Sequence, residues 1–121
     1  MKPLPLSALL ALAFASAETV AQPVARVEVS EIRPLLMRAA AEGSAYGVLT
    51  GVGADYLRRR FAASSPVEID VRSLHALPQP GCSRLEVTTR QRDVAENGKR
   101  EDKTLVYQLS FCRDGGFPEK P

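Results

Sequence analysis

The chain has 121 residues, with 16 Lys and Arg against 14 Asp and Glu, a formal net charge of +2, one His, two Cys and no Trp. This length fits one small domain and excludes two. A chain so close to neutral lacks the strongly basic surface of a dedicated nucleic-acid-binding protein. One His and two Cys are too few for a His/Cys metal cluster. We therefore expect no nucleic-acid partner, no metal and no cofactor.

The first 17 residues have the features of a secretory signal peptide. Lys2 supplies a positive start, residues 6–14 form a short apolar stretch, and Ala15-Ser16-Ala17 is an A-x-A cleavage signal. Cleavage is expected between Ala17 and Glu18. The stretch is too short to span a bilayer, and no later segment is long and apolar enough to do so. The sequence thus predicts a periplasmic or secreted protein without a transmembrane span in the mature chain.

The next segments predict a lead-in and a first helix. Residues 18–29 resemble an exposed lead-in, although Val24, Val27 and Val29 also fit a short edge strand. Ser30 suits a helix N-cap, and apolar residues then follow at helical spacing as far as Gly43, a natural stop.

Residues 44–53 are ambiguous between helix and loop. Gly47, Gly51 and Gly53 make a poor helix interior, yet they permit either a loop or a helix packed closely on its neighbour. Helical spacing returns after Gly53, which predicts a second helix that ends near Ala62.

Three strands are predicted in the second half of the chain. Residues 67–72 alternate apolar and polar side chains, and so do residues 84–94 and 104–112. The Pro78-Gln79-Pro80-Gly81 segment separates the first strand from the second as a turn, because proline cannot donate to a strand ladder.

The last two strands predict a β-hairpin around Glu96-Asn97-Gly98. A three-residue loop places Leu85 opposite Leu109 and Val87 opposite Tyr107, whereas a two-residue loop places these residues opposite polar ones. We therefore favour the three-residue register, since apolar residues must share a face. That register also places Arg92 opposite Asp102.

The same register places Cys82 directly opposite Cys112. An oxidising compartment permits a disulfide, and the hairpin pattern predicts this pairing independently of the cysteines. We expect a Cys82–Cys112 bond. The alternative, a redox-active pair, lacks the usual Cys-x-x-Cys spacing.

The predicted fold class is α+β. An N-terminal helical segment packs on a three-stranded antiparallel meander with one cross-strand disulfide. The predicted organisation is a signal peptide (1–17), a lead-in (18–29), a single domain (30–113) and a loose C-terminal tail (114–121).

The sequence displays no catalytic group, and we expect no enzyme activity. His75 is the only imidazole, and a general base needs a nucleophile within hydrogen-bond reach. Ser73 would share its face of a regular strand, but two residues along a strand are about 6–7 Å apart. Asp70 would lie on the opposite face. An enzyme therefore needs a site that the sequence does not show.

Two candidate interaction surfaces follow from the pattern. The outward side chains of the predicted sheet form a mixed, mildly basic face, and the proline-rich turn lies beside the predicted disulfide. Their residues are Arg72, Arg84, Glu86, Arg90, Pro78, Gln79, Pro80 and Gly81. A separate basic run, Arg58-Arg59-Arg60, reads as a solvated helix end, or as a contact for anionic lipid or an acidic partner.

Three short motifs resemble those of small uncharacterised exported proteins encoded on integrating conjugative elements and type IV secretion loci. The motifs are Gly47-Val-Leu49-Thr-Gly51, Pro80-Gly81-Cys82-Ser-Arg84-Leu85 and Cys112-Arg-Asp114-Gly115. The resemblance covers residues 30–118 and carries over no catalytic residue. It implies an accessory role in the bacterial envelope during DNA transfer.

The function that we expect is therefore a small, non-enzymatic protein-binding module of the envelope. A second hypothesis is a periplasmic enzyme inhibitor or immunity-type protein, by analogy with other helix-on-sheet domains that insert a rigid loop into a cleft. The partner and the oligomeric state stay open.

Overall fold

The computed structural model describes residue 3 and residues 24–119. The predicted signal peptide, with its cleavage between Ala17 and Glu18, lies outside the described residues except for residue 3. The described chain contains β1 (Val27–Val29), α1 (Arg33–Glu42), β2 (Ser44–Leu49), α2 (Val52–Arg60), β3 (Val67–Ala76), β4 (Cys82–Glu96) and β5 (Lys99–Cys112).

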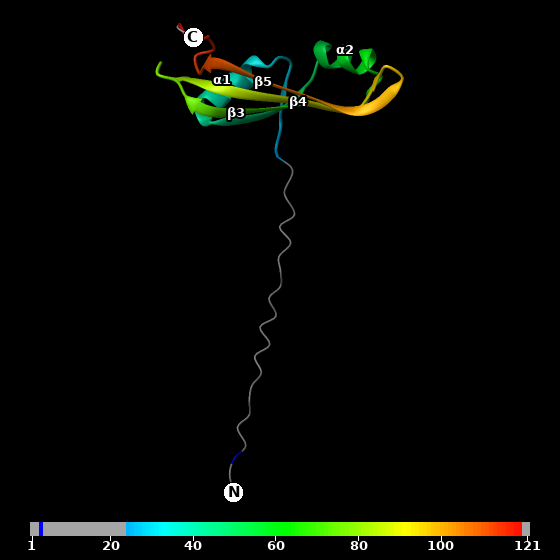
Figure 1. The fold of residues 1–121 in the computed structure, drawn as a ribbon, viewed down its shortest axis with the longest axis horizontal. Helices are drawn as coiled ribbons and strands as arrows, with labels where there is room; N and C mark the ends of the chain where they lie inside the picture. The colour runs from blue at the N-terminus through cyan, green and yellow to red at the C-terminus, as the bar shows by residue number, and fades with distance from the viewer. Residues whose placement is uncertain (1–2, 4–23, 120–121) are drawn as a thin grey trace.

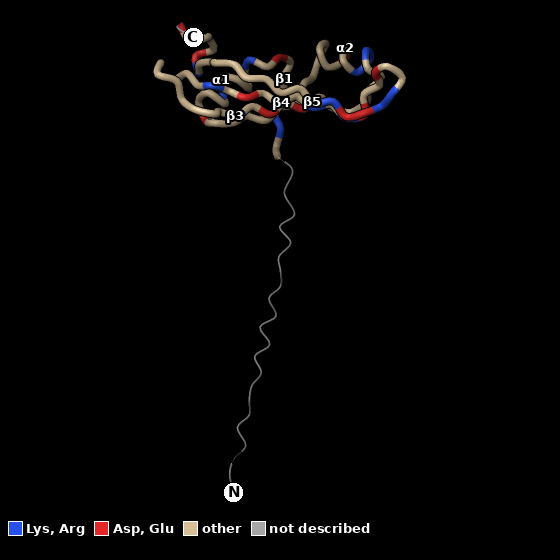
Figure 2. Tube along the Cα trace, in the orientation of Figure 1, with Lys and Arg blue, Asp and Glu red and all other residues tan. Residues whose placement is uncertain are grey.

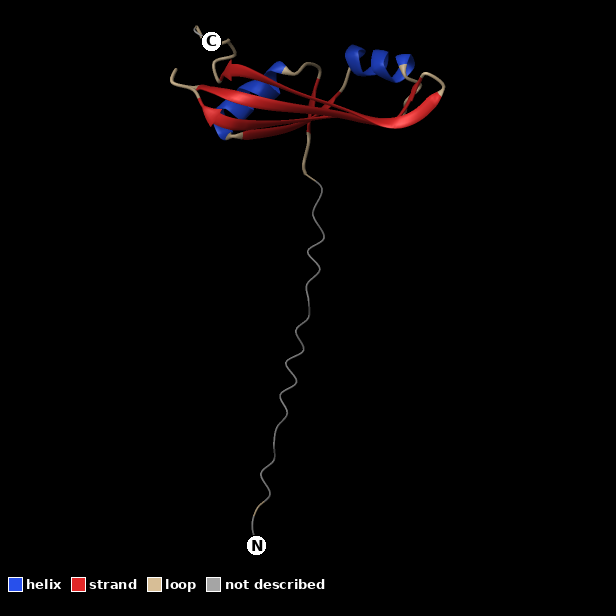
Figure 3. Cartoon of the chain, viewed as in Figure 1, coloured by secondary structure: helices blue, strands red, loops and turns tan. Residues whose placement is uncertain are grey.

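The strands form one five-stranded sheet in the order β1-β2-β3-β4-β5. β1 pairs with β2 in parallel, and all other neighbours are antiparallel. Both helices lie on the same side of the sheet, with α1 over one end and α2 over the other (Figures 1 and 3). The predicted three-stranded meander is therefore wrong, because two further strands extend the sheet on the β3 side.

The strand that the sequence analysis missed is β2, which occupies part of the segment that we read as helix or loop. Its inward residues are Ala45, Gly47 and Leu49, which pair with apolar residues of β3. Two of these three are small because α1 packs directly over them. A Cβ at Gly47 would lie 2.6 Å from Leu35 Cδ1. The alternation therefore carries little hydrophobic contrast and does not read as a strand.

The parallel pairing of β1 follows from the helix between β1 and β2. α1 crosses over the sheet and returns the chain in the same direction, as a helical crossover does. Of the two alternatives for the lead-in, Val27 and Val29 adopt the short edge strand, whereas Val24 lies before it. Val29 is buried in the core.

The main core lies between α1 and the sheet. α1 buries Leu35, Leu36 and Ala39 against the inward residues of the strands. The helix begins at Arg33 rather than just after Ser30, with Ile32 in the cap position, and Pro34 lies in its first turn. It ends at Gly43, as predicted. The φ of Gly43 is 99°, and its N–H donates to the Ala39 carbonyl at 2.8 Å.

A second, smaller buried group lies under α2, where β4 and β5 extend beyond the other strands. It contains Ala54, Ala63, Val67 and Val94, all 4% exposed or less. The Ala95 N–H donates to the Phe61 carbonyl at 2.8 Å, which ties the end of α2 to the hairpin. α2 therefore supports the far half of the β4–β5 hairpin.

The predicted register of the hairpin body is confirmed. Leu85 lies opposite Leu109, Val87 opposite Tyr107 and Cys82 opposite Cys112. The tip differs from the prediction, because Glu96 pairs with Lys99 around a two-residue Asn97-Gly98 turn. Both turn residues have positive φ, as a tight hairpin turn requires.

A bulge reconciles the two-residue turn with the predicted register. Arg92 and Asp93 together face the single residue Asp102, between the Gln91 and Val94 pairs. The Asp93 N–H donates to Asp102 Oδ1 at 3.0 Å, and φ of Asp93 is 51°. One extra residue in β4 thus shifts the pairing by one, so the simple Arg92–Asp102 pair is wrong.

The predicted disulfide is present between Cys82 and Cys112. Beyond it, the chain makes a turn that docks on α1, where Arg33 Nη2 donates to the Gly115 carbonyl at 2.7 Å. Phe117 then packs edge-on against the buried Phe111, with ring centroids 5.3 Å apart. The first residues of the predicted tail are thus part of the packed end of the sheet.

Candidate functional site

The face of the sheet opposite the two helices is not covered by a helix within residues 24–119, and we call it the outer face. The strand register aligns its side chains in rows across β2, β3, β4 and β5. One row is Tyr46, Asp70, Thr88 and Val106; a second is Val48, Glu68, Arg90 and Thr104; a third is Ser44, Arg72, Glu86 and Gln108. Arg84 lies further along β4. All three arginines of the predicted surface, Arg72, Arg84 and Arg90, thus lie on one face.

An ion-pair network holds the middle of the outer face. Asp70 accepts hydrogen bonds from Arg26 Nη1 at 2.7 Å and from Arg90 Nη2 at 2.6 Å. Arg26 also lies 3.0 Å from Glu68 Oε2 and donates to the Gly47 carbonyl at 3.1 Å. Because Arg26 precedes β1, this network fastens the N-terminal lead-in to β3 and, through Asp70, to β4.

A second pair crosses from β3 to β4. Arg72 Nε donates to Glu86 Oε1 at 2.9 Å, and this hydrogen bond raises the pKa of the Arg72 guanidinium above its ordinary value. The Arg72 side chain is 65% exposed, so the pair stays accessible to a partner. Arg84 Nη1 donates to Ser110 Oγ at 3.2 Å and has no carboxylate partner within the described residues.

The proline-rich turn lies at the disulfide end of the sheet, beyond the last pair of β3 and β4. The Cys82 N–H donates to the Gln79 carbonyl at 3.2 Å, and the Arg113 N–H donates to the Gly81 carbonyl at 2.8 Å. Gln79 also accepts a hydrogen bond from the Glu119 N–H. These hydrogen bonds fix the proline-rich turn, which consists of Pro78, Gln79, Pro80 and Gly81. The turn lies at the same end of the sheet as Arg84, whereas Arg90 lies further along β4.

His75 does not lie where a regular strand would place it. A bulge between Ser73 and His75 puts Ser73 opposite Leu85 and His75 opposite Arg84. The expectation that Ser73 and His75 share a face is wrong for this reason. His75 is exposed, and within residues 24–119 no group of three or more His, Cys, Asp or Glu is arranged to hold a metal ion.

The remaining sequence features map to the helix side and to one sheet edge. Arg58, Arg59 and Arg60 form the last turn of α2, away from the outer face.

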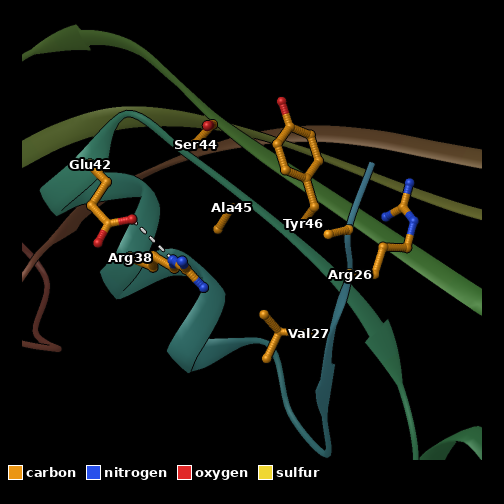
Figure 4. Close-up of a pocket in the computed structure, with 8 residues that line it drawn as sticks. Arg26, Val27, Arg38, Glu42, Ser44, Ala45 and Tyr46 are labelled. Carbon is orange, nitrogen blue, oxygen red and sulfur yellow. Dashed lines mark hydrogen bonds and ion pairs between the residues drawn. The ribbon is translucent and has the colours of Figure 1, made fainter. Parts of the chain in front are cut away.

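A recess of about 290 Å³ lies between α1, β1 and the start of β2. The Arg38–Glu42 ion pair of α1 borders this recess, and the Arg26 side chain points away from the helix (Figure 4). Neither of the two described helices has the length and apolarity that a membrane span needs.

One exposed feature was not predicted, namely the free edge of β5. Charged residues gather at the tip of the hairpin (Figure 2), whereas residues 104–112 carry no charge. Leu105, Val106 and Tyr107 are 61%, 54% and 39% exposed. The sequence signal was the run of apolar residues on both faces of this strand, but nothing in it showed that β5 is the last strand of the sheet.

The fold and these surfaces define a disulfide-stapled, two-layer domain of helices on one face of a mixed sheet. Comparisons of the chain with known protein families, with curated proteins and with solved structures found no match.

Proposed function

We propose that this chain is a non-enzymatic protein-binding module of the bacterial envelope, and that its outer face docks on another protein. The observation that carries the proposal is the set of three arginines that two adjacent strands place on the outer face of the sheet. Arg72, Arg84 and Arg90 present guanidinium groups that are already oriented by Glu86, Ser110 and Asp70. Side chains held in place before binding lose less conformational entropy on binding.

The chemistry of this surface favours an acidic protein partner. Arginine donates bidentate hydrogen bonds to carboxylates and is enriched at protein interfaces. Arg84 has no carboxylate partner within the described residues. Arg72 binds Glu86 through Nε, so its Nη groups can donate to an incoming carboxylate. The flanking Tyr46 and Val106 add apolar area to the same face.

The resemblance to exported proteins of conjugative elements supplies the setting. The disulfide is compatible with an oxidising compartment outside the cytoplasm. On this basis we propose an accessory role for a conjugative transfer or type IV secretion apparatus in the periplasm or at the cell surface.

The test is crosslinking of the tagged, exported protein in cells, followed by mass spectrometry of the captured proteins. We expect a secretion-channel or pilus component to be captured. A triple variant with Arg72→Gln, Arg84→Gln and Arg90→Gln should lower that capture at least about tenfold.

The matched control carries Arg58→Gln, Arg59→Gln and Arg60→Gln on α2, which removes the same charge from the opposite side of the sheet. This control should capture the partner as well as the wild type does. Equal capture by both triple variants would count against the outer face as the docking surface.

A second candidate function is inhibition of a periplasmic enzyme, and the fixed loop at the disulfide end favours it. Backbone hydrogen bonds and the neighbouring disulfide hold the Pro78–Gly81 loop in one conformation, as in loops that inhibit by filling a cleft. A panel of periplasmic hydrolases assayed with micromolar protein tests this. Lack of inhibition across the panel would remove this candidate.

A further inference from the structure

β5 is an edge strand whose open side carries unsatisfied backbone groups in a regular pattern. The N–H and C=O of Cys112 bond outside the sheet, to Gly116 and Gly115. Backbone groups alternate sides along an antiparallel strand, and the register from Cys112 to Thr104 is unbroken. The open side therefore belongs to Thr104, Val106, Gln108 and Ser110, and none of their backbone groups has a partner outside the sheet ladder within residues 24–119.

The side chains of this segment also lack the features that usually prevent an edge strand from pairing with another chain. Natural edge strands usually carry a charge, a proline or a covering element that prevents pairing with another chain. The segment from Thr104 to Ser110 has no charge and no proline. α1 and α2 cover the two ends of the sheet (Figure 3), and Leu105 and Tyr107 remain exposed on the helix side between them.

We propose that β5 pairs with β5 of a second copy of this chain, antiparallel and centred on Tyr107, so that the two sheets join into one. This inference concerns the open edge of β5 rather than the arginines of the outer face, and it does not depend on the proposed function. The two surfaces meet at Arg84 and Val106.

The segment is complementary to itself in this register. A two-fold axis at Tyr107 sets Leu105 opposite Leu109 of the second copy and Tyr107 opposite its counterpart, so apolar side chains meet on the helix side. Thr104 and Val106 pair with Ser110 and Gln108 of the second copy. Four residue pairs that each exchange two hydrogen bonds give about eight new hydrogen bonds.

Charge selects this register over its neighbours. Moving the centre to Val106 sets Lys103 opposite Leu109, and moving it to Leu105 sets Lys103 opposite Tyr107 and Glu101 opposite Leu109. Only the register centred on Tyr107 pairs the whole open segment from Thr104 to Ser110 with itself. A centre at Gln108 sets Thr104 opposite Cys112, whose backbone groups already bond to Gly115 and Gly116. It also brings Glu101 toward Arg113 of the second copy, which is exposed, at each end of the new ladder.

The space beside the strand fits an incoming strand. A groove of about 470 Å³ borders the β5 edge and is lined by Arg84, Gln108, Leu109, Ser110, Phe117 and Pro118. Phe117 is 71% exposed. In the proposed register, Thr104 and Val106 of the second copy enter this groove, and Phe117 gains an apolar neighbour.

The first test is the mass of the purified, disulfide-intact exported protein, measured by light scattering after gel filtration. We expect a dimer at about 100 µM protein, and we expect Val106→Lys to raise the dimer dissociation constant at least about tenfold. Val52→Lys is the matched control, since Val52 is 84% exposed on α2, and it should leave the dimer unchanged. Circular dichroism confirms that both variants fold.

The second test fixes the register by cysteine crosslinking. Tyr107→Cys should form a disulfide-linked dimer, because the two Tyr107 positions lie directly opposite in a non-hydrogen-bonded pair. Leu105→Cys should not, because its counterpart is displaced along the strand.

Each outcome decides the proposal. A dimer that is sensitive to Val106→Lys and crosslinks through residue 107 supports it. A monomer at this concentration, a dimer insensitive to Val106→Lys, or crosslinking through residue 105 in place of residue 107 overturns it. Arg72 and Arg90 lie away from this edge, and Arg84 only borders its groove. A monomeric protein that still captures its envelope partner therefore overturns the dimer alone.

Discussion

At the scale of single residues, Gly47 sets how closely α1 approaches the sheet. A Cβ at this position would meet the two Cδ atoms of Leu35 at 2.6 and 2.9 Å. Leu35 is only 2% exposed and is packed in the main core, so its side chain has little room to turn away. The absence of a side chain at Gly47 is therefore part of the packing of α1.

We expect Gly47→Ala to lower the free energy of unfolding by about 1–3 kcal/mol, as overpacking of a core does. Gly53→Ala is the matched control. A Cβ there meets only Leu49 at 3.9 Å, and alanine favours a helix by up to about 1 kcal/mol over glycine. Chemical denaturation of the two variants should show changes of opposite sign. A neutral Gly47→Ala would mean that Leu35 can repack.

Tyr107 makes the stability of the folded protein depend on pH in the alkaline range. Burial raises the pKa of its phenol above the ordinary 10.0, because the partly desolvated site disfavours the phenolate. The contribution of this residue to stability is therefore fully present below pH 10.0 and is lost as the pH rises through the raised pKa.

A spectrophotometric titration of the wild type against Tyr107→Phe tests this expectation. The tyrosinate absorbance that the variant lacks should appear with a midpoint above pH 10.0. The loss of unfolding free energy above pH 10.0 should also be smaller in the variant. If the tyrosinate absorbance that the variant lacks has its midpoint at or below pH 10.0, the phenol of Tyr107 is not desolvated in the folded protein.

At the scale of elements, the β4–β5 hairpin is the longest unit of the fold, and each of its ends is secured differently. The disulfide closes the end near Cys82 and Cys112. At the other end, Arg100 binds both the Asp93 side chain and the Ala62 carbonyl, which joins the bulge to the end of α2. The hairpin is thus held at both ends, whereas the open side of β5 is free along its middle.

Removing the disulfide should lower the free energy of unfolding by about 3–4 kcal/mol, since it closes a segment with a sequence separation of 30. Reduction of the wild type isolates the bond itself. The variant with Cys82→Ala and Cys112→Ala should lose somewhat more, because both cysteines are buried. Denaturation with and without reductant measures this. If reductant also lowers the free energy of unfolding of the double variant, its effect on the wild type does not come from the Cys82–Cys112 bond alone.

At the scale of the whole molecule, the Asp70 network joins three segments that are distant in the sequence. Asp70 lies on β3, Arg90 on β4, and Arg26 in the lead-in before β1. The Arg26 side chain is only 19% exposed. The network therefore secures the short parallel strand β1, which has only three residues paired with β2.

Asp70→Asn should lower the free energy of unfolding by about 1–2 kcal/mol, because two partly buried guanidinium groups lose a charged acceptor. Hydrogen exchange of the β1 amides should rise in the same variant. Arg72→Gln, which breaks a more exposed pair, should leave the stability nearly unchanged. Unchanged β1 exchange in Asp70→Asn would mean that the network does not hold the lead-in.

Features that depend on local alternation and on strongly coded turns could be predicted from the amino-acid order alone. The β4–β5 register, the Cys82–Cys112 pairing and the end of α1 at Gly43 all followed from side-chain period and glycine conformation. These signals are local because cross-strand neighbours in a hairpin are separated by one short connection.

By contrast, packing between distant segments makes β2 a strand, sets β1 parallel to it and leaves β5 as the free edge. Ala45 and Gly47 are small because α1 packs on them, which removed the contrast that marks a strand. Bulges reversed the face of His75 and shifted the pairing at Arg92. Which strand lies at the edge depends on how all five strands pair, and hydrophobic periodicity along the chain carries no information about that order.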